Sequence, residues 1–320
     1  MNGLTVLSPL QALLAVAGGL AMLVGGGEML VIGATRLARQ SGMSMLLIGL
    51  TVVAFGTSVP ELSVSLTASL QGHPDIMIGN VVGSNIANIG LILGLSALLQ
   101  RLELNLQAVR IELLLVIAAS IILMLCSAYG RFPRSLGIIF VLTLIVYTFL
   151  ACRNHTNGQH SEQTADEEKT GPPSLGFISF LVLAGLALLT YGATIFIRGA
   201  ADMARYLGVS ELIIGLTLAA VGTSLPELAT SLSALRRNES GLLIGNIIGS
   251  NMFNLLMVLG LTAVIKPFAL SAALLQRDLP VMLAFSLALV AILQQSHGIR
   301  RWHGLLFLAA YGTYYYFLFS

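Results

Sequence analysis

The chain has 320 residues, of which 56% are hydrophobic and 9% are charged, with a mean hydropathy of +0.90 and a net charge of +2. A soluble domain carries about 25% charged residues, so this composition excludes a soluble globular protein and predicts a chain that crosses a lipid membrane several times. The net charge is also too small to indicate a nucleic-acid partner.

Ten apolar runs are long enough to cross a bilayer, which takes about 20 residues of helix. In chain order they cover approximately residues 8–38, 43–70, 75–99, 107–129, 134–152, 174–204, 209–235, 241–265, 272–294 and 302–319. The first run lacks the basic flank of a signal peptide, so we expect it to be retained as a span. The longer runs can be accommodated by tilting or by a break in the helix.

A polar segment at residues 153–173 separates the first five runs from the last five. It has mixed charge, no apolar periodicity and a Gly-Pro-Pro sequence at its end. We interpret it as a solvated cytoplasmic linker, too short to hold a regulatory domain. The predicted domains are therefore a first five-helix unit at residues 1–152 and a second at residues 174–320.

The two units repeat one another. Residues 50–98 align with residues 216–264 at a constant offset of 166, and 23 of the 49 aligned positions are identical. Because each unit has an odd number of spans, the second enters the membrane in the opposite sense. Such inverted repeats are typical of secondary transporters, whose site lies where the repeats meet near the middle of the membrane. We expect an all-α membrane protein of ten transmembrane helices in two inverted five-helix repeats, with broken helices at the site.

The distribution of basic residues predicts the orientation. With the N-terminus outside, ten of the 16 Lys and Arg residues fall in cytoplasmic loops and six in outer loops. Cytoplasmic loops carry the excess of Lys and Arg in membrane proteins, so we expect both termini outside. The compact chain without a regulatory insert favours a prokaryotic inner membrane.

Two short motifs, GTSVPE at residues 56–61 and GTSLPE at residues 222–227, place a proline and a glutamate inside apolar runs. Proline cannot donate a main-chain hydrogen bond, so it frees the carbonyl four residues earlier. A freed carbonyl at membrane depth must face protein or a wet cavity, and a bound cation would satisfy it. A carboxylate at mid-bilayer costs at least ~2.5–3.5 kcal/mol, which indicates that Glu61 and Glu227 are functional groups facing inward.

Neutral oxygen ligands recur around both glutamates. Hydroxyls precede each glutamate within one helical turn, and GNVVGSNIAN and GNIIGSNMFN follow downstream. The candidate side chains are Thr57, Thr223, Ser58, Ser224, Ser84, Ser250, Asn88 and Asn254. Hard oxygen ligands without nearby Cys or His suit Ca²⁺ or Na⁺ better than Zn²⁺ or copper. The glycine spacing alone is typical of helix packing, but packing does not require two glutamates.

With these motifs the chain resembles the sodium/calcium exchanger family of the cation/calcium antiporter superfamily, in a prokaryotic-type form. The resemblance covers the whole ten-helix layout and implies antiport of Ca²⁺ against Na⁺ by alternating access, with no cofactor. It implies that Ca²⁺ binds the carboxylates of Glu61 and Glu227 and the main-chain carbonyls of Thr57 and Thr223. Na⁺ would use the same glutamates with Ala54, Ser58, Ser84, Ala220, Thr223, Ser224 and Ser250.

One position departs from some members of that family. They carry Asp where this chain has Asn254, whereas Asn88 matches the usual pattern. Two carboxylates balance one Ca²⁺ or two Na⁺, so the two ions are expected to compete, and a third Na⁺ would leave an extra positive charge. The change argues against K⁺ cotransport and leaves the stoichiometry open.

The first and sixth spans are long and glycine-rich, and in the family this pair moves against the rest. Glu28 in the first span aligns with Thr194 at the repeat offset, and the sequence assigns it no role. We expect a functional monomer in membrane lipid, with Ca²⁺ and Na⁺ as its partners.

Three other functions stay open at this point. A Ca²⁺/H⁺ antiporter is the nearest alternative, and uptake independent of Na⁺ would identify it. A passive channel would conduct without a counter-ion. A membrane enzyme such as an intramembrane metalloprotease is disfavoured, because the sequence has no HExxH or other nucleophile-base set.

Overall fold

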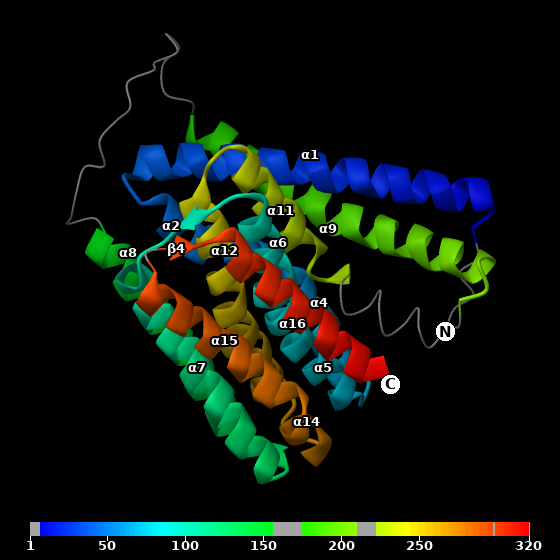
Figure 1. The fold of residues 1–320 in the computed structure, drawn as a ribbon, viewed down its shortest axis with the longest axis vertical. Coiled ribbons are helices and arrows are strands. Elements are labelled where there is room, and N and C mark those ends of the chain that lie inside the picture. Colours follow the sequence, from blue (N-terminus) through cyan, green and yellow to red (C-terminus); the bar gives the residue numbers. More distant parts are fainter. Residues whose placement is uncertain (1–6, 156–173, 210–221, 297, 320) are drawn as a thin grey trace.

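The computed structural model describes residues 7–155, 174–209, 222–296 and 298–319, and helices dominate it (Figure 1). The first half contains α1 (Pro9–Ser41), α2 (Met45–Ile48), η1 (Gly49–Val53), α3 (Ala54–Thr57), α4 (Val59–Leu70), α5 (Pro74–Ala87), η2 (Asn88–Leu93), α6 (Gly94–Leu99), β1 (Leu102–Glu103), α7 (Leu106–Ala128), β2 (Arg131–Phe132) and α8 (Arg134–His155). The second contains α9 (Leu175–Tyr206), α11 (Leu225–Arg236), α12 (Ser240–Phe253), η3 (Asn254–Leu259), α13 (Gly260–Ile265), β3 (Phe268–Ala269), α14 (Ala272–Gln276), α15 (Asp278–Gln295), β4 (Gly298–Ile299) and α16 (Arg301–Phe319). The η elements are π-helices.

Seven described helical segments are long and apolar enough to cross a membrane. They are Pro9–Ser41, Pro74–Leu99, Leu106–Ala128, Arg134–Arg153, Leu175–Tyr206, Ser240–Ile265 and Leu274–Gln295. The bent pair Met45–Thr57 and Val59–Leu70 makes an eighth candidate. Of the other two predicted spans, 209–235 lies partly outside the described residues, and α16 is a 19-residue helix with four tyrosines that falls outside this set.

The predicted break in the second span lies at the first GTS-containing motif. Helix α3 ends at Thr57 and α4 begins at Val59, with Pro60 in its first turn and an angle of 41° between the two segments. Proline cannot extend the hydrogen-bond ladder of the preceding helix, which explains the bend. In the second half, α11 likewise begins with Pro226 in its first turn, and residues 210–221 lie outside the described part.

The last-but-one predicted span is present as Leu274–Gln295 and contains a local interruption of the helix. Helix α14 ends at Gln276 and α15 begins at Asp278, separated by Arg277. Pro280 stands in the first turn of α15, where its missing N–H leaves the carbonyl of Gln276 without a helical partner. The interruption therefore follows from one proline that the sequence interpretation passed over.

The sequence repeat is also a repeat of elements. Helices α4, α5 and α6, with η2 and β1, begin and end 166 residues before α11, α12 and α13, with η3 and β3. Even the π-helical segments coincide, since η2 begins at Asn88 and η3 at Asn254. The duplicated sequence therefore folds twice into the same succession of segments.

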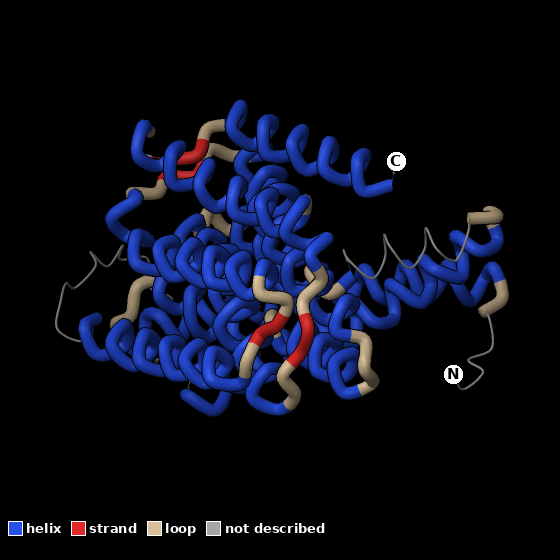
Figure 2. Tube along the Cα trace, turned by 90° about the horizontal axis from the view of Figure 1, so that it is seen from below, coloured by secondary structure: helices blue, strands red, loops and turns tan. Residues whose placement is uncertain are grey.

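Two short antiparallel ladders join the two halves. Strand β1 pairs with β4, and β2 pairs with β3. The equivalent strands β1 and β3 thus belong to different ladders, which lie well apart in Figure 2. Helix α7 connects β1 to β2, and its 23 residues span about 35 Å at 1.5 Å per residue. Equivalent elements of the two halves therefore lie at opposite ends of α7.

Helices α1 and α9 lie side by side and cross the other long helices at a steep angle (Figure 1). Glycines at seven-residue intervals bring their backbones into contact; these are Gly19, Gly26 and Gly33 in α1 and Gly185, Gly192 and Gly199 in α9. A Cβ atom at Gly185 would stand 2.7 Å from the main-chain nitrogen of Leu30. Small residues at such spacing allow membrane helices to approach closely.

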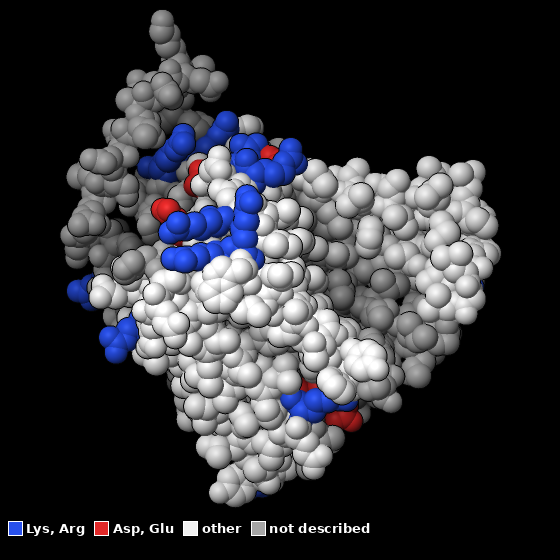
Figure 3. Space-filling view, in the orientation of Figure 1, with Lys and Arg blue, Asp and Glu red and all other residues white. Residues whose placement is uncertain are grey.

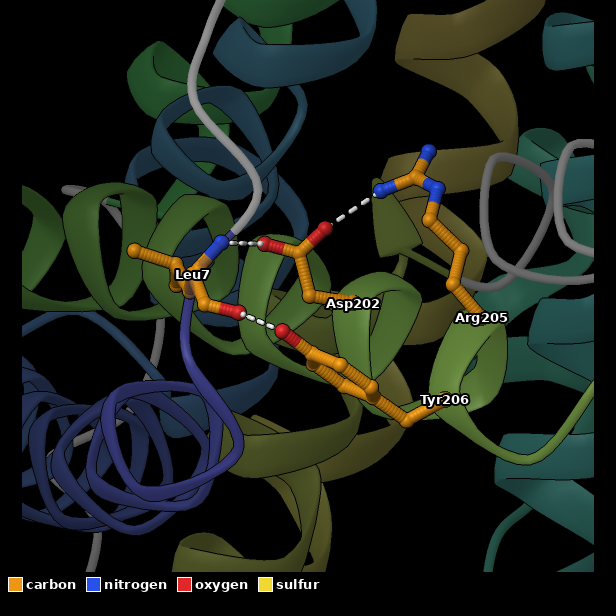
Figure 4. Close-up of polar contacts among 4 residues, drawn as sticks. All are labelled: Leu7, Asp202, Arg205 and Tyr206. Atoms are coloured by element: carbon orange, nitrogen blue, oxygen red, sulfur yellow. Dashed lines mark hydrogen bonds and ion pairs between the residues drawn. The ribbon is translucent and has the colours of Figure 1, made fainter.

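Polar contacts join the N-terminal end of α1 to the C-terminal end of α9 (Figure 4). The main-chain N–H of Leu7 donates to Asp202 at 3.0 Å, and the hydroxyl of Tyr206 donates to the carbonyl oxygen of Leu7 at 2.8 Å. Arg205 forms an ion pair with Asp202, which is buried. With the glycine contacts, these bonds make α1 and α9 one packed unit.

In each half, a hydrogen bond between a tyrosine and a carboxylate joins the last two long helices. Tyr147 of α8 donates to Glu112 of α7, and Tyr314 of α16 donates to Asp278 of α15 at 3.1 Å. The acids are related by the repeat offset, and the tyrosines by one residue more. Glu112 is buried and needs such a partner, whereas Asp278 is partly exposed and also pairs with Arg277. The two hydrogen bonds join α7 to α8 and α15 to α16.

Basic side chains gather at one end of the molecule. In Figure 3 most of the visible Lys and Arg lie over the region of α11, α12 and β4, above a broad uncharged face. Arg237, which follows α11, pairs with Glu28 of α1, and Arg301 at the start of α16 donates to the carbonyl oxygen of Leu99. This end resembles the aqueous margin of a membrane protein, and the uncharged face suits lipid.

Candidate functional site

The two predicted glutamates occupy equivalent, fully buried positions. Glu61 lies in the first turn of α4 and Glu227 in the first turn of α11, each with 0% of its surface exposed. None of their four carboxylate oxygens has a hydrogen-bond partner among the described residues. The carboxylates are close enough to repel each other, and each benefits from the positive end of its own helix.

Buried carboxylates without partners are costly unless a positive charge joins them. Among the described residues, no cluster of three or more His, Cys, Asp or Glu is arranged to hold a metal. Within the described residues, the negative charge available to a cation therefore comes from the carboxylates of Glu61 and Glu227. Such a site is suited to transported cations bound largely by neutral oxygen ligands.

Hydroxyl groups from both halves meet beside the glutamates. The hydroxyl of Thr57 lies 3.3 Å from that of Ser250, and Ser84 lies 3.5 Å from Thr223. Thr57 and Ser250 also lie near the carboxylate of Glu227, although neither meets hydrogen-bond geometry with it. Thr57 of the first half thus contacts α12 of the second half, and Thr223 of the second half contacts α5 of the first half.

The remaining predicted hydroxyls, Ser58 and Ser224, are buried and have no hydrogen-bond partners in the described part of the chain. Both stand directly before the proline-containing helices α4 and α11. Ala54 is buried at the start of α3, and its carbonyl oxygen accepts from the main-chain N–H of Ser58 at 3.0 Å. Ala220, the twelfth predicted residue, lies outside the described residues.

The two predicted asparagines each begin a π-helix. Asn88 donates to the amide oxygen of Asn251 at 3.0 Å, while its own amide oxygen has no partner within the ranges described. Asn254 is fully buried, and neither of its amide atoms has a partner there. Single π-helical turns frequently occur at functional sites because they redirect main-chain and side-chain groups. The amide oxygens of Asn88 and Asn254 are therefore two further buried oxygens without a hydrogen-bond partner among the described residues.

The sequence interpretation missed five residues that bond to the predicted ligands or to their partners: Asn251, which accepts from Asn88, and the four that follow. Asn80 accepts from Thr223 at 3.0 Å, and Asn246 accepts from Thr57 at 3.2 Å. Their amide groups donate to hydroxyls of their own halves, namely those of Ser65 and Ser231. The available signal was the repeat itself, because both asparagines and both serines recur at the offset of 166.

The sequence profile of one family, described as sodium/calcium exchanger protein, matches residues 11–153 and again residues 177–320. The chain belongs to the sodium/calcium exchanger family. The resemblance drawn from the paired motifs is thereby confirmed, and this exchanger is a membrane antiporter of the cation/Ca²⁺ type. The two matches fall on the two halves of the chain, as expected for a duplicated unit.

Individual relatives agree over nearly the whole exchanger. It is 38% identical over 309 residues to the putative antiporter CaxA of Alkalimonas amylolytica, covering 94% of this chain and 97% of the relative. It is 32% identical over 342 residues to the sodium/calcium exchanger MaX1 of Methanosarcina acetivorans, covering 94% and 96%. A solved structure of the sodium-calcium exchanger NCX_Mj, soaked with 2.5 mM Na⁺ and 10 mM Sr²⁺, matches with a TM-score of 0.82 at 34% identity, covering 95% and 97%.

Proposed function

We propose that this protein exchanges Ca²⁺ for Na⁺ across the membrane by alternating access. One observation carries the proposal: each half contributes a fully buried glutamate, Glu61 or Glu227, whose oxygens have no hydrogen-bond partner among the residues described. Family membership supports cation/Ca²⁺ antiport. Coupling to Na⁺ is a more specific proposal than cation/Ca²⁺ antiport. The hydroxyls beside the carboxylates support it, because Na⁺ is bound by neutral oxygens.

The ligand roles follow the family resemblance. Ca²⁺ takes the carboxylates of Glu61 and Glu227 with the main-chain carbonyls of Thr57 and Thr223. Na⁺ uses the same carboxylates with Ala54, Ser58, Ser84, Ala220, Thr223, Ser224 and Ser250. Asn88 and Asn254 add neutral amide oxygens. All of these are hard ligands of the kind that Ca²⁺ and Na⁺ prefer.

Charge balance provides the coupling. Two carboxylates are neutralised by one Ca²⁺ or by two Na⁺, so each ion displaces the other from the same groups. A site with uncompensated charge would have to pass a low-dielectric barrier when the protein changes state, and that passage is costly. Exchange therefore follows from the rule that only a neutralised site crosses between inward-facing and outward-facing forms.

The proposed architecture is ten transmembrane helices in two inverted repeats, residues 1–152 and 174–320, joined by the linker at 153–173. The opposite placement of the equivalent strands β1 and β3 supports the inversion. The contacts between α1 and α9 support their movement as one body against the other helices. The protein acts as a monomer and needs no cofactor beyond its transported ions.

We place the protein in a prokaryotic inner membrane with both termini outside. The basic end of the molecule supports this orientation (Figure 3). The elements there, α11 and β4, adjoin Arg237 and Arg300, which the sequence predicts to lie in cytoplasmic loops. An excess of Lys and Arg marks the cytoplasmic side of membrane proteins.

The proposal is tested by uptake of ⁴⁵Ca²⁺ into proteoliposomes loaded with Na⁺, K⁺ or choline at a fixed membrane potential. Uptake should require internal Na⁺ and disappear in Glu61→Gln and Glu227→Gln. Glu112→Gln is the matched control, since Glu112 is a buried glutamate outside the site whose replacement can still accept from Tyr147.

A separate arm imposes a pH gradient without Na⁺. Uptake driven by that gradient alone would identify a Ca²⁺/H⁺ antiporter on the same scaffold. Flux that needs no counter-ion would instead indicate a channel. Either result would overturn Na⁺-coupled exchange while leaving the family assignment intact.

A further inference from the structure

We propose that Asn80 and Asn246 are positioning residues that set the direction of the hydroxyl groups in the ion site. Each acts across the boundary between the halves, on a threonine of the other half. The inference rests on the proposed function, because it concerns the same site. Neither asparagine is assigned there as an ion ligand.

The orientation of the Asn80 amide is determined by its surroundings. Its Nδ2 lies 3.3 Å from the main-chain oxygen of Glu61 and 2.9 Å from Oγ of Ser65. A main-chain oxygen can only accept a hydrogen bond, so the amide nitrogen must face Glu61. The amide oxygen of Asn80 consequently faces Thr223, at 3.0 Å from its Oγ1.

Asn246 stands at the equivalent position, at the offset of 166, but the partner of its Nδ2 among the described residues is a hydroxyl alone, so we assign its amide the direction found at Asn80. Its Nδ2 donates to Oγ of Ser231 at 3.4 Å, and its Oδ1 lies 3.2 Å from Oγ1 of Thr57. Asn246 is 0% exposed and Asn80 is 9% exposed, whereas Thr223 is partly exposed. Two equivalent bridges therefore connect the halves at the site.

Each bridge fixes the direction of a hydroxyl proton. An amide oxygen carries no hydrogen, so Thr223 must donate its only hydroxyl proton to Asn80. Ser84 lies 3.5 Å from Thr223, and it becomes the donor in that pair because the threonine proton is already engaged. The result is a directed chain from Ser84 through Thr223 to Asn80.

The second chain runs from Ser250 through Thr57 to Asn246, with 3.3 Å between the two hydroxyl oxygens. Oγ1 of Thr57 also lies 3.5 Å from the main-chain oxygen of Ala54, and the amide oxygen of Asn246 is the nearer acceptor at 3.2 Å. In both chains the protons point toward the asparagine and away from the serine at the start. That serine keeps both lone pairs free. A hydroxyl binds a cation through a lone pair, so the asparagines prepare Ser84 and Ser250 as Na⁺ ligands.

Loss of the acceptor should weaken Na⁺ binding more than Ca²⁺ binding. In Asn80→Leu the Thr223 proton has no amide oxygen to meet and can turn toward Ser84 or the ion. Removing one hydrogen bond of this kind corresponds to about a twofold to tenfold change in an equilibrium constant. We expect the Na⁺ concentration for half-maximal exchange to rise by that factor. The Ca²⁺ concentration should change less, because Ca²⁺ depends on carboxylates and main-chain carbonyls.

A double-mutant cycle in the proteoliposome assay tests the inference. Asn80→Leu, Thr223→Val and the double variant are compared for half-saturating Na⁺ and Ca²⁺. Valine keeps the main-chain carbonyl of residue 223 while removing its hydroxyl. If Asn80 acts through that hydroxyl, the double variant should be no worse than Thr223→Val alone. Multiplied effects on Na⁺ would overturn the inference, because they would mean that Asn80 acts independently.

The mirrored cycle with Asn246→Leu and Thr57→Val provides a second test if the first set fails to fold. Ser120→Ala and Ser286→Ala are matched controls, because these buried serines also recur at the offset of 166 but bond only to their own helices within the described structure. They should leave half-saturating Na⁺ unchanged. A wild-type protein without Na⁺-dependent uptake would refute the proposed function itself, whereas wild-type exchange with multiplied variant effects would refute only the positioning role.

Discussion

Replacing Gly19 by alanine should force α1 and α9 apart. A Cβ atom at this position would stand 2.6 Å from the main-chain nitrogen of Phe196 and 2.8 Å from the main-chain oxygen of Gly192. Ordinary van der Waals contact begins at 3.4 Å, so the backbones must separate locally by about 0.8 Å, the difference between 3.4 and 2.6 Å. The obstructing atoms belong to the main chain, and no side chain can rotate out of the way.

The expected loss of stability follows from this overpacking. Extra volume in a packed interface costs about 1–3 kcal/mol, and the better helix propensity of alanine returns about 0.5–1 kcal/mol. The midpoints of the two ranges, about 2 and about 0.75 kcal/mol, leave a net loss of about 1.25 kcal/mol. At roughly 2–4 °C per kcal/mol for a chain of a few hundred residues, the Tm should fall by about 2–5 °C.

A thiol-reactive fluorophore measures this Tm in detergent-purified protein. The two cysteines are free, and Cys126 is buried while Cys152 is partly exposed. A Cys152→Ala background therefore leaves one thiol that reacts only when the helices open. Uptake measurements on the same variants would show whether function follows stability.

Gly18→Ala is the matched control. Gly18 is the neighbouring residue, and a Cβ atom there would meet nothing within 4 Å in the described structure. This variant should keep the wild-type Tm or raise it slightly through helix propensity. Equal Tm values for Gly18→Ala and Gly19→Ala would refute the view that the two helices pack backbone to backbone at Gly19.

Two further predictions concern charged groups at the basic end. Glu28→Gln removes an ion pair in which Glu28 of α1 lies 2.7 Å from Arg237, the residue that follows α11. This partly exposed pair contributes up to about 1 kcal/mol, so under the proposed movement of α1 its loss should shift the equilibrium between the two states by up to about fivefold. Spin-label distances between α1 and α11 measure the shift, and an unchanged distribution would contradict it. Burial raises the pKa of Glu239, and the nearby Arg39 and Arg237 oppose this rise. The charged carboxylate therefore lowers the free energy of unfolding at pH values above the raised pKa. It has no such effect once the pH falls below the ordinary pKa of a carboxyl group, because the group is then protonated in both the folded and the unfolded state. Glu239→Gln should therefore raise the Tm at pH 8 and leave it unchanged at pH 4; the opposite order would show that the arginines dominate.

The sequence predicted those parts of the protein that stand out against an apolar background. A proline followed by glutamate within a membrane span is costly in any setting, and its recurrence at one offset singled out Glu61 and Glu227. Both residues lie in the first turns of helices, as the proline implies. Repetition also predicted the correspondence of α4 with α11.

Contacts between distant segments could not be predicted in the same way. The partner of Glu28 lies 209 residues away, and only packing determines that α1 passes beside α11. Asn80 likewise gives no local signal, because its partner Thr223 belongs to the other half. The glycines of α1 and α9 did carry a signal in their seven-residue spacing, but a heptad of glycines indicates close packing without naming the partner helix.

The two strand ladders have a consequence for assembly. Each ladder takes one strand from each half, β1 with β4 and β2 with β3, so a half-length chain would leave every one of its described strands unpaired. It could complete both ladders only by joining a second half, which in the proposed architecture enters the membrane the other way round. The same union would bring two glutamates together from two separate polypeptides. Covalent fusion through the linker fixes the ratio and the relative orientation of the halves, and a chain cut within residues 156–173 retains every described strand needed to reassemble.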